Sequence, residues 1–365
     1  MKKLRGCLFI TTIFIFSALP LLQAQDSPVA LAPKKAFIME FEQTIKEIYK
    51  KNSPAIVRIS SCPETEDKNG SCSKIGTGFI IRPDGYILTT ADLICNADSI
   101  EVIFSDDWKY MAKLIAMDMK LNIALIKIAK KGLPVVTIGV SDGIVPGMFV
   151  LNIANPYGLA NSLAIGYISG RYRSGFMTGQ VENYLQTTIP LNPGDSGSPL
   201  FNCRGEVIGI MSAVLVDDMN SSTNEPQLFQ PSGISFAIPI DIIKDNIPDM
   251  IKEGRLPRCW VGFEVQSLMR EDFIRAGIYK AEDQHGILIT KIFPDSPAIR
   301  AGLKAGDIIQ KVDQRDVLHL SDLQMYIIKT GVDKIIEFTI IRGNMRFNVP
   351  VQTEEMPDFI LNKKM

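Results

Sequence analysis

Asn192-Pro193-Gly194-Asp195-Ser196-Gly197-Ser198-Pro199-Leu200 is the stretch of sequence that decides the fold. Glycines on both sides of Ser196 allow the backbone to turn sharply. Such a turn exposes the serine hydroxyl and directs the N–H groups of Gly194 and Ser196 at one spot. Two donors arranged in this way form an oxyanion hole. The same residues are also compatible with an ordinary turn between two strands, so the flanking sequence must decide.

Sequence blocks on both sides of this stretch resemble those of the HtrA/DegP family of trypsin-like serine proteases. They follow the family's order from about residue 45 to 350, most of the chain. The blocks are Gly76-Thr77-Gly78-Phe79-Ile80-Ile81, Gly85-Tyr86-Ile87-Leu88-Thr89, Asn155-Pro156-Tyr157-Gly158-Leu159, Leu185-Gln186-Thr187 and Gly233-Ile234-Ser235-Phe236-Ala237-Ile238-Pro239. The resemblance implies a mainly β fold, in which a trypsin-like double β-barrel is followed by one small α+β PDZ domain.

The first residues have the pattern of a secretory signal peptide. Lys2, Lys3 and Arg5 form a basic head, an apolar run follows from Cys7 to Leu19, and Ala24 suits cleavage. A membrane anchor is the alternative, but about 13 apolar residues are fewer than the roughly 20 that span a bilayer. We therefore predict a periplasmic or secreted protein with no stable membrane span after cleavage.

Length and local pattern indicate how the chain is divided. A chain of 365 residues is typical of two domains, and 39 basic against 40 acidic residues give no indication of a nucleic acid partner. Apolar residues at helical spacing over 37–51 predict a helix ended by Ser53-Pro54. The short β-branched runs that follow favour barrels. The predicted parts are a signal peptide (1–24), an N-terminal helical segment (25–54), a degenerate trypsin-like protease domain (55–245), a PDZ domain (258–352) and a flexible tail (353–365). Helices are also expected at 240–253 and 320–329, and an exposed loop at 217–231.

Five cysteines remain after the predicted cleavage site. Cys62 and Cys72 bracket a polar loop, and a disulfide between them would stabilise the fold by roughly 3 kcal/mol in an oxidising compartment. Zinc is the alternative, but the spacing is unsuitable and no histidine is near. Cys95, Cys203 and Cys259 cannot all pair with one another, so at least one buried thiol is expected. Neither a metal nor another cofactor is predicted.

Two positions of the catalytic triad are replaced. Serine chemistry needs a base for the hydroxyl and an acid that orients the base. The resemblance puts the nucleophile at Ser196, but Asp92 occupies the position of the histidine and Asn122 that of the aspartate. The chain has two histidines, His285 and His319, and both lie in the PDZ-like region. An aspartate, whose ordinary pKa is near 4, is a poor general base at neutral pH unless it is desolvated.

Other residues near Ser196 also depart from the family. Ser198 stands where the family usually has glycine, and Ile189 and Pro190 replace small residues near the expected specificity pocket. Bulkier walls would narrow that pocket. Ser196 could then be a relic in a turn whose glycines are kept for geometry, and we predict a protease domain that does not cut.

The PDZ-like region keeps the features of a peptide-binding site. Such domains add an extended peptide to an exposed sheet edge and hold its terminal carboxylate with backbone N–H groups. The loop that matches this role is Trp260-Val261-Gly262-Phe263, and the expected walls of the side-chain pocket are Leu323 and Ile327. The alternative is that these apolar residues only fill the core.

Three functions are therefore open. The first is an inactive HtrA-like protein that binds unfolded proteins or C-terminal peptides. The second is an active serine endopeptidase that uses Ser196 with an unconventional base. The third is a structural subunit of an envelope assembly. The resemblance also implies a homotrimer formed through aromatic residues near the N-terminus. Phe37 and Phe41 are candidates, although helix packing explains them nearly as well.

Overall fold

The computed structural model describes residues 31–62, 74–173, 183–216, 231–275, 284–343 and 345–357. The chain divides into two units, residues 1–43 and 44–365. Helix α1 (Leu31–Asn52) contains the helix expected over 37–51 and continues to the boundary of the 3₁₀ turn η2 (Ser53–Ala55). Pro54 lies in the first turn of η2, where its missing N–H is tolerated. Within the second unit, Ile48 is buried in the barrel core.

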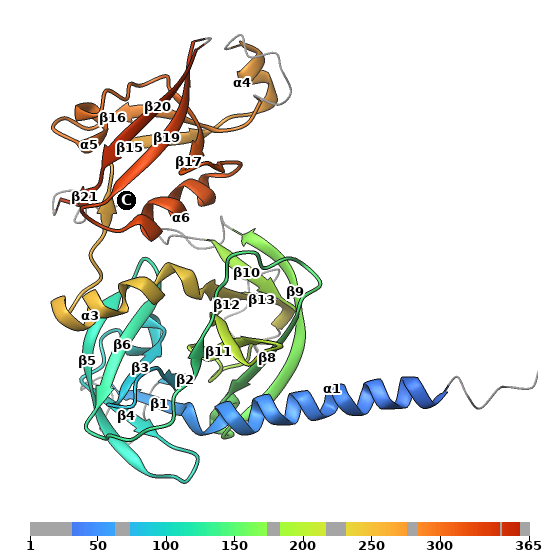
Figure 1. Cartoon of the computed structure of the whole chain (residues 1–365). Coiled ribbons are helices and arrows are strands. Elements are labelled where there is room, and N and C mark those ends of the chain that lie inside the picture. Colours follow the sequence, from blue (N-terminus) through green and yellow to red (C-terminus); the bar gives the residue numbers. More distant parts are fainter. Residues whose placement is uncertain are drawn as a thin grey trace, which may run out of the picture. The chain divides into compact units, whose positions relative to one another are not determined.

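The first barrel is a closed antiparallel sheet with strand order β1-β2-β3-β6-β5-β4 (Figure 1). Alternate side chains of these short β-branched strands point inward, so that Ile59, Phe79 and Leu125 are completely buried. Phe79 lies opposite both Ile56 and Leu88 in the ladder. The elements are β1 (Ile56–Cys62), β2 (Lys74–Ile80), β3 (Tyr86–Thr89), α2 (Ala91–Ile94), β4 (Ser99–Ile103), β5 (Lys109–Asp118) and β6 (Ile123–Ile128).

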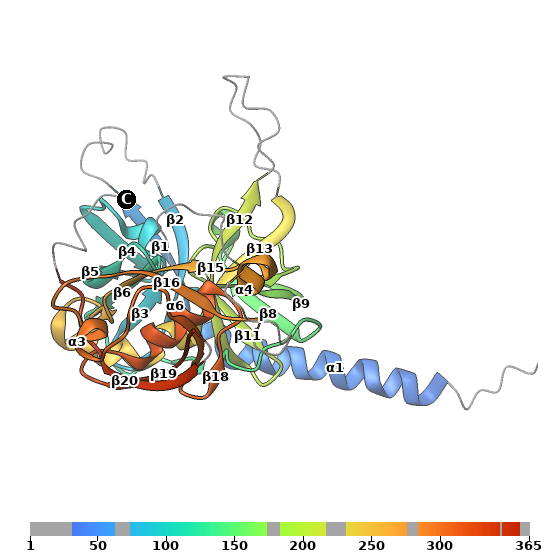
Figure 2. The ribbon, with the colours of Figure 1, turned by 90° about the horizontal axis from the view of Figure 1, so that it is seen from above.

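The second barrel has strand order β11-β8-β9-β10-β13-β12 and closes by pairing of β11 with β12 (Figures 1 and 2). Strand β7 adds to β12 in parallel. The predicted mainly β double barrel is thus confirmed. The predicted loop at 217–231 lies almost wholly outside the described residues. The elements are β7 (Thr137–Ile138), β8 (Phe149–Ala154), η4 (Pro156–Gly158), β9 (Ser162–Arg173), β10 (Tyr184–Thr187), β11 (Pro199–Asn202), β12 (Glu206–Val216) and β13 (Pro231–Pro239).

The segment after the second barrel is not the single helix expected over 240–253. It consists of the 3₁₀ turns η5 (Ile240–Ile242) and η6 (Lys244–Asn246), followed by α3 (Ile247–Glu253). Pro248 lies in the first turn of α3, a position where its missing N–H breaks no helical hydrogen bond. The α-helix therefore begins at Ile247, with this proline in its first turn, and Gly254 ends it in the left-handed conformation with φ 69°.

The C-terminal domain is built on a sheet of order β15-β16-β17-β19-β20, with β18 paired to β17 and a separate ladder of β14 with β21. Residues 354–355 form β21, so this part of the predicted flexible tail is ordered against β14. Helix α6 covers the expected 320–329. The elements are β14 (Cys259–Trp260), β15 (Phe263–Ser267), α4 (Arg270–Arg275), β16 (Ile287–Ile292), α5 (Pro297–Arg300), β17 (Ile308–Val312), β18 (Arg315–Asp316), α6 (Leu320–Thr330), β19 (Ile335–Arg342), β20 (Met345–Gln352) and β21 (Glu354–Glu355).

Helix α6 belongs to two hydrophobic cores. Leu323 is buried in the core of the C-terminal domain, and Ile327 packs against the same core. On another face, Met325 is buried in the cluster that fills the barrels, and Ile328 packs against that cluster. Helix α6 therefore lies between the C-terminal sheet and the barrels and joins them through apolar contacts.

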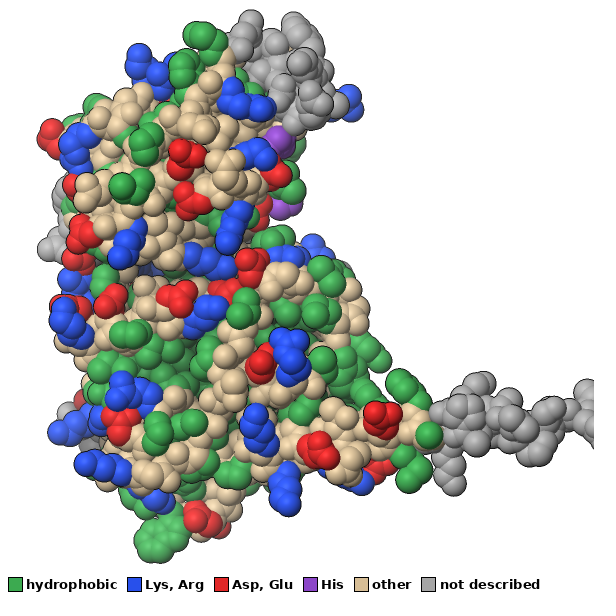
Figure 3. Space-filling view, viewed as in Figure 1, with side chains coloured by type: hydrophobic (Ala, Val, Ile, Leu, Met, Phe, Trp, Pro, Cys, Tyr) green, Lys and Arg blue, Asp and Glu red, His purple; other side chains and the backbone are tan. Residues whose placement is uncertain are grey.

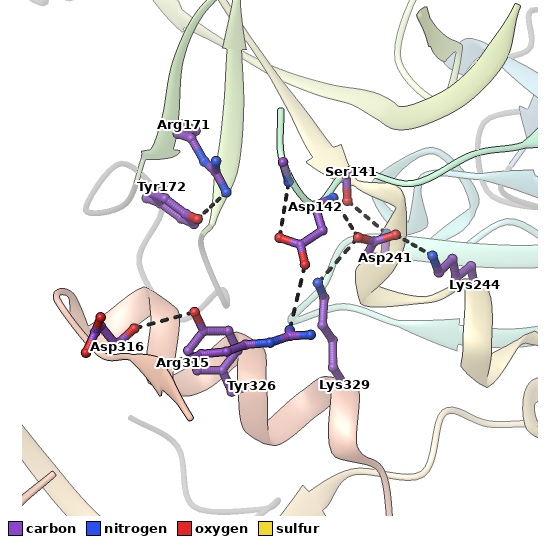
Figure 4. Close-up of polar contacts among 11 residues, drawn as sticks. Ser141, Asp142, Arg171, Tyr172, Asp241, Lys244, Arg315, Asp316, Tyr326 and Lys329 are labelled. Carbon is purple, nitrogen blue, oxygen red and sulfur yellow. Dashed lines mark hydrogen bonds and ion pairs between the residues drawn. The ribbon is translucent and has the colours of Figure 1, made fainter. Parts of the chain in front are cut away.

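Ion pairs reinforce this contact between the two domains (Figure 4). The buried carboxylate of Asp241, on η5, lies 3.3 Å from Lys329 Nζ of α6 and 2.7 Å from Lys244 Nζ. It also accepts a hydrogen bond from the Asp142 backbone N–H at 2.8 Å. Asp142 in turn faces Arg315 at 3.7 Å. One buried carboxylate of the barrels thus holds one lysine of helix α6.

The structure tests only part of what the sequence predicts for the cysteines. Cys62 ends β1, but Cys72 lies outside the described residues, so their disulfide stays a prediction. Cys95, Cys203 and Cys259 are free, and Cys259 is buried, as expected for one of the three. Burial raises the pKa of the Cys259 thiol to about 11, although a hydrogen bond with Thr353 opposes this. This thiol therefore stays protonated at neutral pH and is a poor nucleophile.

Basic and acidic side chains are interspersed over the face of the molecule shown in Figure 3. Within the described part of the chain, none of the helices has the length and apolar character needed to cross a bilayer. Among the same residues, no group of three or more His, Cys, Asp and Glu side chains could hold a metal ion.

Candidate active site

The backbone of the turn around Ser196 is tightly constrained. The Asp195 N–H donates to the Asn192 carbonyl at 3.0 Å, and Gly194, the third residue of this turn, has φ 101°. A positive φ at that position defines a type II turn, which requires glycine. A Cβ atom at Gly194 would also lie 2.5 Å from the Asn155 carbonyl oxygen.

Hydrogen bonds from other segments fix the carbonyl groups of this turn. The Pro193 oxygen accepts from the Tyr157 N–H at 2.7 Å, and the Gly194 oxygen accepts from Thr77 Oγ1 at 2.7 Å. The Asp195 oxygen accepts from the Ser198 N–H at 3.0 Å. The C=O and N–H of a trans peptide point in opposite directions. The N–H groups of Gly194 and Ser196 therefore point away from these partners, and no described residue accepts a hydrogen bond from either.

Thr77 is the residue that links this turn to the first barrel. Besides its bond to Gly194, its backbone N–H donates to the Ser196 carbonyl at 2.9 Å, and its hydroxyl accepts from the Asn155 N–H at 3.0 Å. Thr77 is completely buried on β2. The sequence identifies the block that contains Thr77 but not its role, because its hydrogen bonds to the turn join residues more than a hundred positions apart.

Asn122 makes two hydrogen bonds at the position that the resemblance assigns to the triad aspartate. Its Oδ1 accepts from the Asp92 N–H at 2.9 Å, and its Nδ2 donates to Ser212 Oγ at 3.0 Å. The side chain is 1% exposed. A carboxylate buried here without a neighbouring histidinium would be an uncompensated charge, which is costly. The neutral amide accepts from the Asp92 N–H and donates to Ser212 without that cost. The sequence offers no signal for the part played by Ser212.

Asp92 does not take up a position suited to a buried general base. It is exposed on the short helix α2, and its Oδ1 accepts from the neighbouring Leu93 N–H at 2.9 Å. Lys74 Nζ donates to the Asp92 carbonyl at 2.9 Å, so a positive charge lies at the same place. The two histidines lie far along the chain in the C-terminal domain, where His319 caps helix α6.

Ile189, Pro190, Asp195 and Ser198 differ in how deeply they are buried. Ile189 is completely buried in the core of the second barrel, whereas Pro190 is exposed. Ser198 is buried and accepts a hydrogen bond from Asn152 Nδ2 at 2.7 Å. The Asp195 carboxyl is also buried. Burial raises its pKa, although the Asn192 backbone and side-chain N–H groups donate to Oδ2 and oppose the increase.

The loop 260–263 has a similar arrangement of carbonyl groups. The Val261 oxygen accepts from the Ala298 N–H at 2.8 Å and the Gly262 oxygen from the Phe293 N–H at 3.0 Å. The N–H groups of Gly262 and Phe263 therefore point the other way. Among the described residues, β15 pairs on one side only, with β16. Its other edge is therefore available for an added strand.

The side chains predicted to surround this loop differ in how deeply they are buried. Trp260 and Val261 are buried and anchor the loop, and Leu323 is buried beneath it in the domain core. Ile327 is only partly buried. The side chain available to touch a ligand in this set is therefore Ile327 rather than Leu323.

Comparisons with known proteins find matches to both the barrel part and the C-terminal part of this chain. Residues 76–210 match the trypsin-like peptidase domain and residues 261–353 the PDZ domain. A probable periplasmic serine endoprotease DegP-like of Marinomonas sp. (strain MWYL1) is 33% identical over 80% of this chain and 59% of that protein. The solved HtrA-type protease AlgW with tripeptide has a TM-score of 0.68 and 28% identity, over 85% of this chain and 96% of AlgW. This chain belongs to the HtrA family.

A second relative with the same DegP-like name, from Halomonas elongata, is 36% identical over 78% of this HtrA chain and 57% of that protein. The chain thus spans less than two thirds of the length of these two curated relatives. A serine endoprotease from Yersinia pestis has a TM-score of 0.57 and 26% identity, and the match covers 87% of this HtrA chain and 98% of that one. The periplasmic names of the curated relatives confirm the predicted periplasmic location.

Proposed function

We propose that this chain is an HtrA homologue that does not cut proteins and that binds unfolded proteins or peptides by their C-termini through its PDZ domain. The observation that carries the proposal is the pair formed by Asp92 and Asn122. Asn122 is buried and hydrogen-bonded as a neutral group through both ends of its amide, and Asp92 is exposed and bound to its own helix. Nothing in this arrangement supplies a base to Ser196.

A test of the catalytic part is labelling of the full chain with a fluorophosphonate, together with a casein cleavage assay. The loss of a triad histidine costs about a million-fold in turnover in subtilisin, so no cleavage above background is expected. Robust labelling of Ser196, with casein cleavage that disappears in Ser196→Ala, would instead establish an active endopeptidase with an unconventional base.

We expect the PDZ domain to bind peptides with a free C-terminus and an apolar last residue, with Kd on the order of micromolar. Main-chain hydrogen bonds to β15 would supply affinity, and the N–H groups of Gly262 and Phe263 would hold the carboxylate. The measurement is fluorescence polarisation with the full chain, comparing free and amidated peptides. Equal binding of both forms would contradict carboxylate capture, and no binding would favour a structural subunit.

Two variants separate this peptide site from the rest of the domain. Gly262→Val should abolish binding, because a Cβ at Gly262 would lie 2.2 Å from Ser296 Cβ at a backbone φ of 92°. Since that change also strains the loop, Ile327→Arg provides a milder block on the surface of α6. Ile335→Arg is the matched control, because Ile335 is 72% exposed on β19. It should bind like the unmodified chain.

We further propose that the chain forms a homotrimer. Phe37 and Phe41 of α1 are 68% and 39% exposed, and their rings stack at 6.4 Å. Exposed apolar side chains also lie on one face of β9, namely Leu163, Ile165 and Tyr167. Apolar groups gather over β8 and β9 in Figure 3 as well. Exposed apolar surface of this kind often marks a protein interface.

Light scattering at micromolar concentration should therefore give the mass of three chains. Phe37→Ser with Phe41→Ser should yield a monomer, because two apolar anchors are lost. The control is Met39→Ser on the same helix, which removes one side chain that is 60% exposed and should leave the trimer intact. A monomeric unmodified chain would refute the proposal.

A further inference from the structure

We propose that an open groove on the C-terminal domain binds acidic segments of polypeptides, apart from the loop 260–263. The groove lies between the turn that joins β17 to β18, the C-terminal half of α6 and the start of β19, and it has a volume of about 390 Å³. Ligand pockets typically measure about 300–1,000 Å³, so this groove is large enough for a ligand. The polar residues that line it are Asp313, Arg315, Tyr326, Lys329, Thr330 and Lys334.

Three positively charged side chains line this groove from three different elements. Arg315 belongs to β18, Lys329 belongs to α6, and Lys334 directly precedes β19. The acidic side chain on the same wall is Asp313, whose Oδ1 accepts the Glu337 N–H at 2.9 Å. The positive charges therefore outnumber the negative charge on the wall of the groove, and this balance favours an anionic ligand.

The cations of the groove keep hydrogen-bond donors for a ligand. Lys329 Nζ lies 3.3 Å from Asp241, and the Arg315 guanidinium lies 3.7 Å from Asp142 (Figure 4). An ammonium group has three N–H donors and a guanidinium has five, so one pairing uses only some of them. Lys334 is exposed, and no acidic side chain in the described part of the chain forms an ion pair with it. Lys334 therefore gains a partner outright when an anion binds.

The backbone around the groove is ordered by internal contacts. Thr330 Oγ1 donates to the Tyr326 carbonyl at 2.8 Å within α6, and the Arg315 guanidinium lies 5.7 Å from the centre of the Tyr326 ring. The Lys334 N–H donates to Thr353 Oγ1 at 3.0 Å, which fixes the start of β19. These segments are therefore in place before a ligand arrives, so that less conformational freedom is lost on binding.

The walls of the groove favour the carboxylates of a peptide over a larger polyanion. Lysine and arginine both bind carboxylates, and arginine does so through a planar fork of N–H groups. Val312 and Ile335 also line the groove, and the Ile335 side chain is 72% exposed. These apolar groups can contact the methylene groups of Asp and Glu side chains. Nucleic acids need a longer run of cations than this groove has. The ligand class is therefore an acidic polypeptide segment.

The groove and the peptide-binding loop are separate sites on one domain. Leu323 and Ile327 of α6 pack with the domain core near the loop, whereas other positions of the helix line the groove. The inference therefore depends neither on the loss of catalysis nor on capture of a terminal carboxylate. A polypeptide that engages both sites at once would be held more tightly than at either site alone.

The test is fluorescence polarisation of the full chain with a labelled peptide that carries several Asp and Glu residues and an amidated C-terminus. The amide cannot supply a terminal carboxylate to the loop. A matched peptide has Asn and Gln in place of Asp and Glu. At low salt the acidic peptide should bind at least about tenfold more tightly than the neutral one, and about 0.3 M salt should reduce the difference, because salt screens exposed charges. An excess of the apolar peptide with a free C-terminus should not displace the acidic peptide.

Variants at the groove locate the binding. Lys334→Gln should weaken binding of the acidic peptide about two- to fivefold, and Lys334→Gln with Arg315→Gln about tenfold or more. The matched control is Lys304→Gln, which removes an exposed lysine of the same domain that does not line the groove. All three positions are exposed, so the fold should be retained.

Three results would each overturn the inference. They are equal binding of the acidic and neutral peptides, an equal loss of binding in Lys304→Gln, and displacement of the acidic peptide by the apolar one. The comparison of free and amidated apolar peptides is a separate measurement, so the PDZ proposal and this one can fail independently.

Discussion

Asp92→His combined with Asn122→Asp is expected to turn this chain into a weak but measurable serine peptidase. Asn122 already occupies the required place, since it accepts from the N–H of residue 92 and contacts Ser212 Oγ. An aspartate there would keep the first bond and accept the second from the Ser212 hydroxyl. A complete triad is worth about a million-fold in turnover, and we expect at least a thousandfold gain over the unmodified chain. The measurement is hydrolysis of small-residue fluorogenic substrates.

Each single variant serves as a control for the pair. Asn122→Asp alone should lower the free energy of unfolding by about 1–3 kcal/mol, because it buries a carboxylate without a cation. Asp92→His alone should gain little, since an amide partner stabilises the wrong histidine tautomer. Ser196→Ala in the double variant must abolish the activity. A folded double variant with no activity would show that the turn or the buried Ile189 prevents catalysis even with the triad rebuilt.

The second large effect is expected from Asp241→Ala, at the contact between the barrels and helix α6. The Asp241 side chain is 3% exposed and is the common partner of Lys244 and Lys329. Removing one member of a buried ion pair typically costs 3–5 kcal/mol, and we expect about 2–3 kcal/mol here because both lysines retain some access to water. Urea unfolding gives the loss of stability. Hydrogen exchange should also show faster opening of α6.

The matched control is Asp142→Ala. Asp142 and Arg315 are both more than half exposed and 3.7 Å apart, so their ion pair contributes at most about 1 kcal/mol. The same loss of stability in both variants would mean that burial of Asp241 is not what matters.

Stability should depend on pH through the same carboxylate. Burial alone would raise the pKa of Asp241, but its contacts with Lys244 and Lys329 outweigh burial and hold the pKa below the ordinary value. A carboxyl with a lowered folded pKa stabilises the fold above its unfolded pKa of about 4, and this contribution is lost as the pH falls through the folded value. The difference in stability between the unmodified chain and Asp241→Asn should therefore shrink on acidification below about pH 4.

The sequence was sufficient to predict the two barrels and the PDZ domain, because each depends on short local blocks. The replacement of two triad residues stays a prediction. The sequence did not predict the contacts that fix the turn. The bonds from Thr77 to Gly194 and from Asn122 to Ser212 join segments 117 and 90 residues apart. No local pattern encodes them. The first half of the helix expected over 240–253 likewise consists of 3₁₀ turns, where Asp241 binds Lys329 and the Asp142 N–H from distant segments.

Helix α6 also determines how this chain can be divided. Met325 and Ile328 belong to the apolar cluster of the barrels, although the helix is part of the PDZ fold. A fragment cut in the predicted linker 254–257 would carry both side chains into water, together with a Lys329 that has lost its anion. Such a fragment should be prone to self-association. The complementary barrel fragment would expose the apolar surface that Met325 and Ile328 cover. The barrels and the PDZ domain therefore behave as one unit in any exchange of domains between relatives. A swap of the PDZ domain alone should succeed only if helix α6 stays with its own barrels.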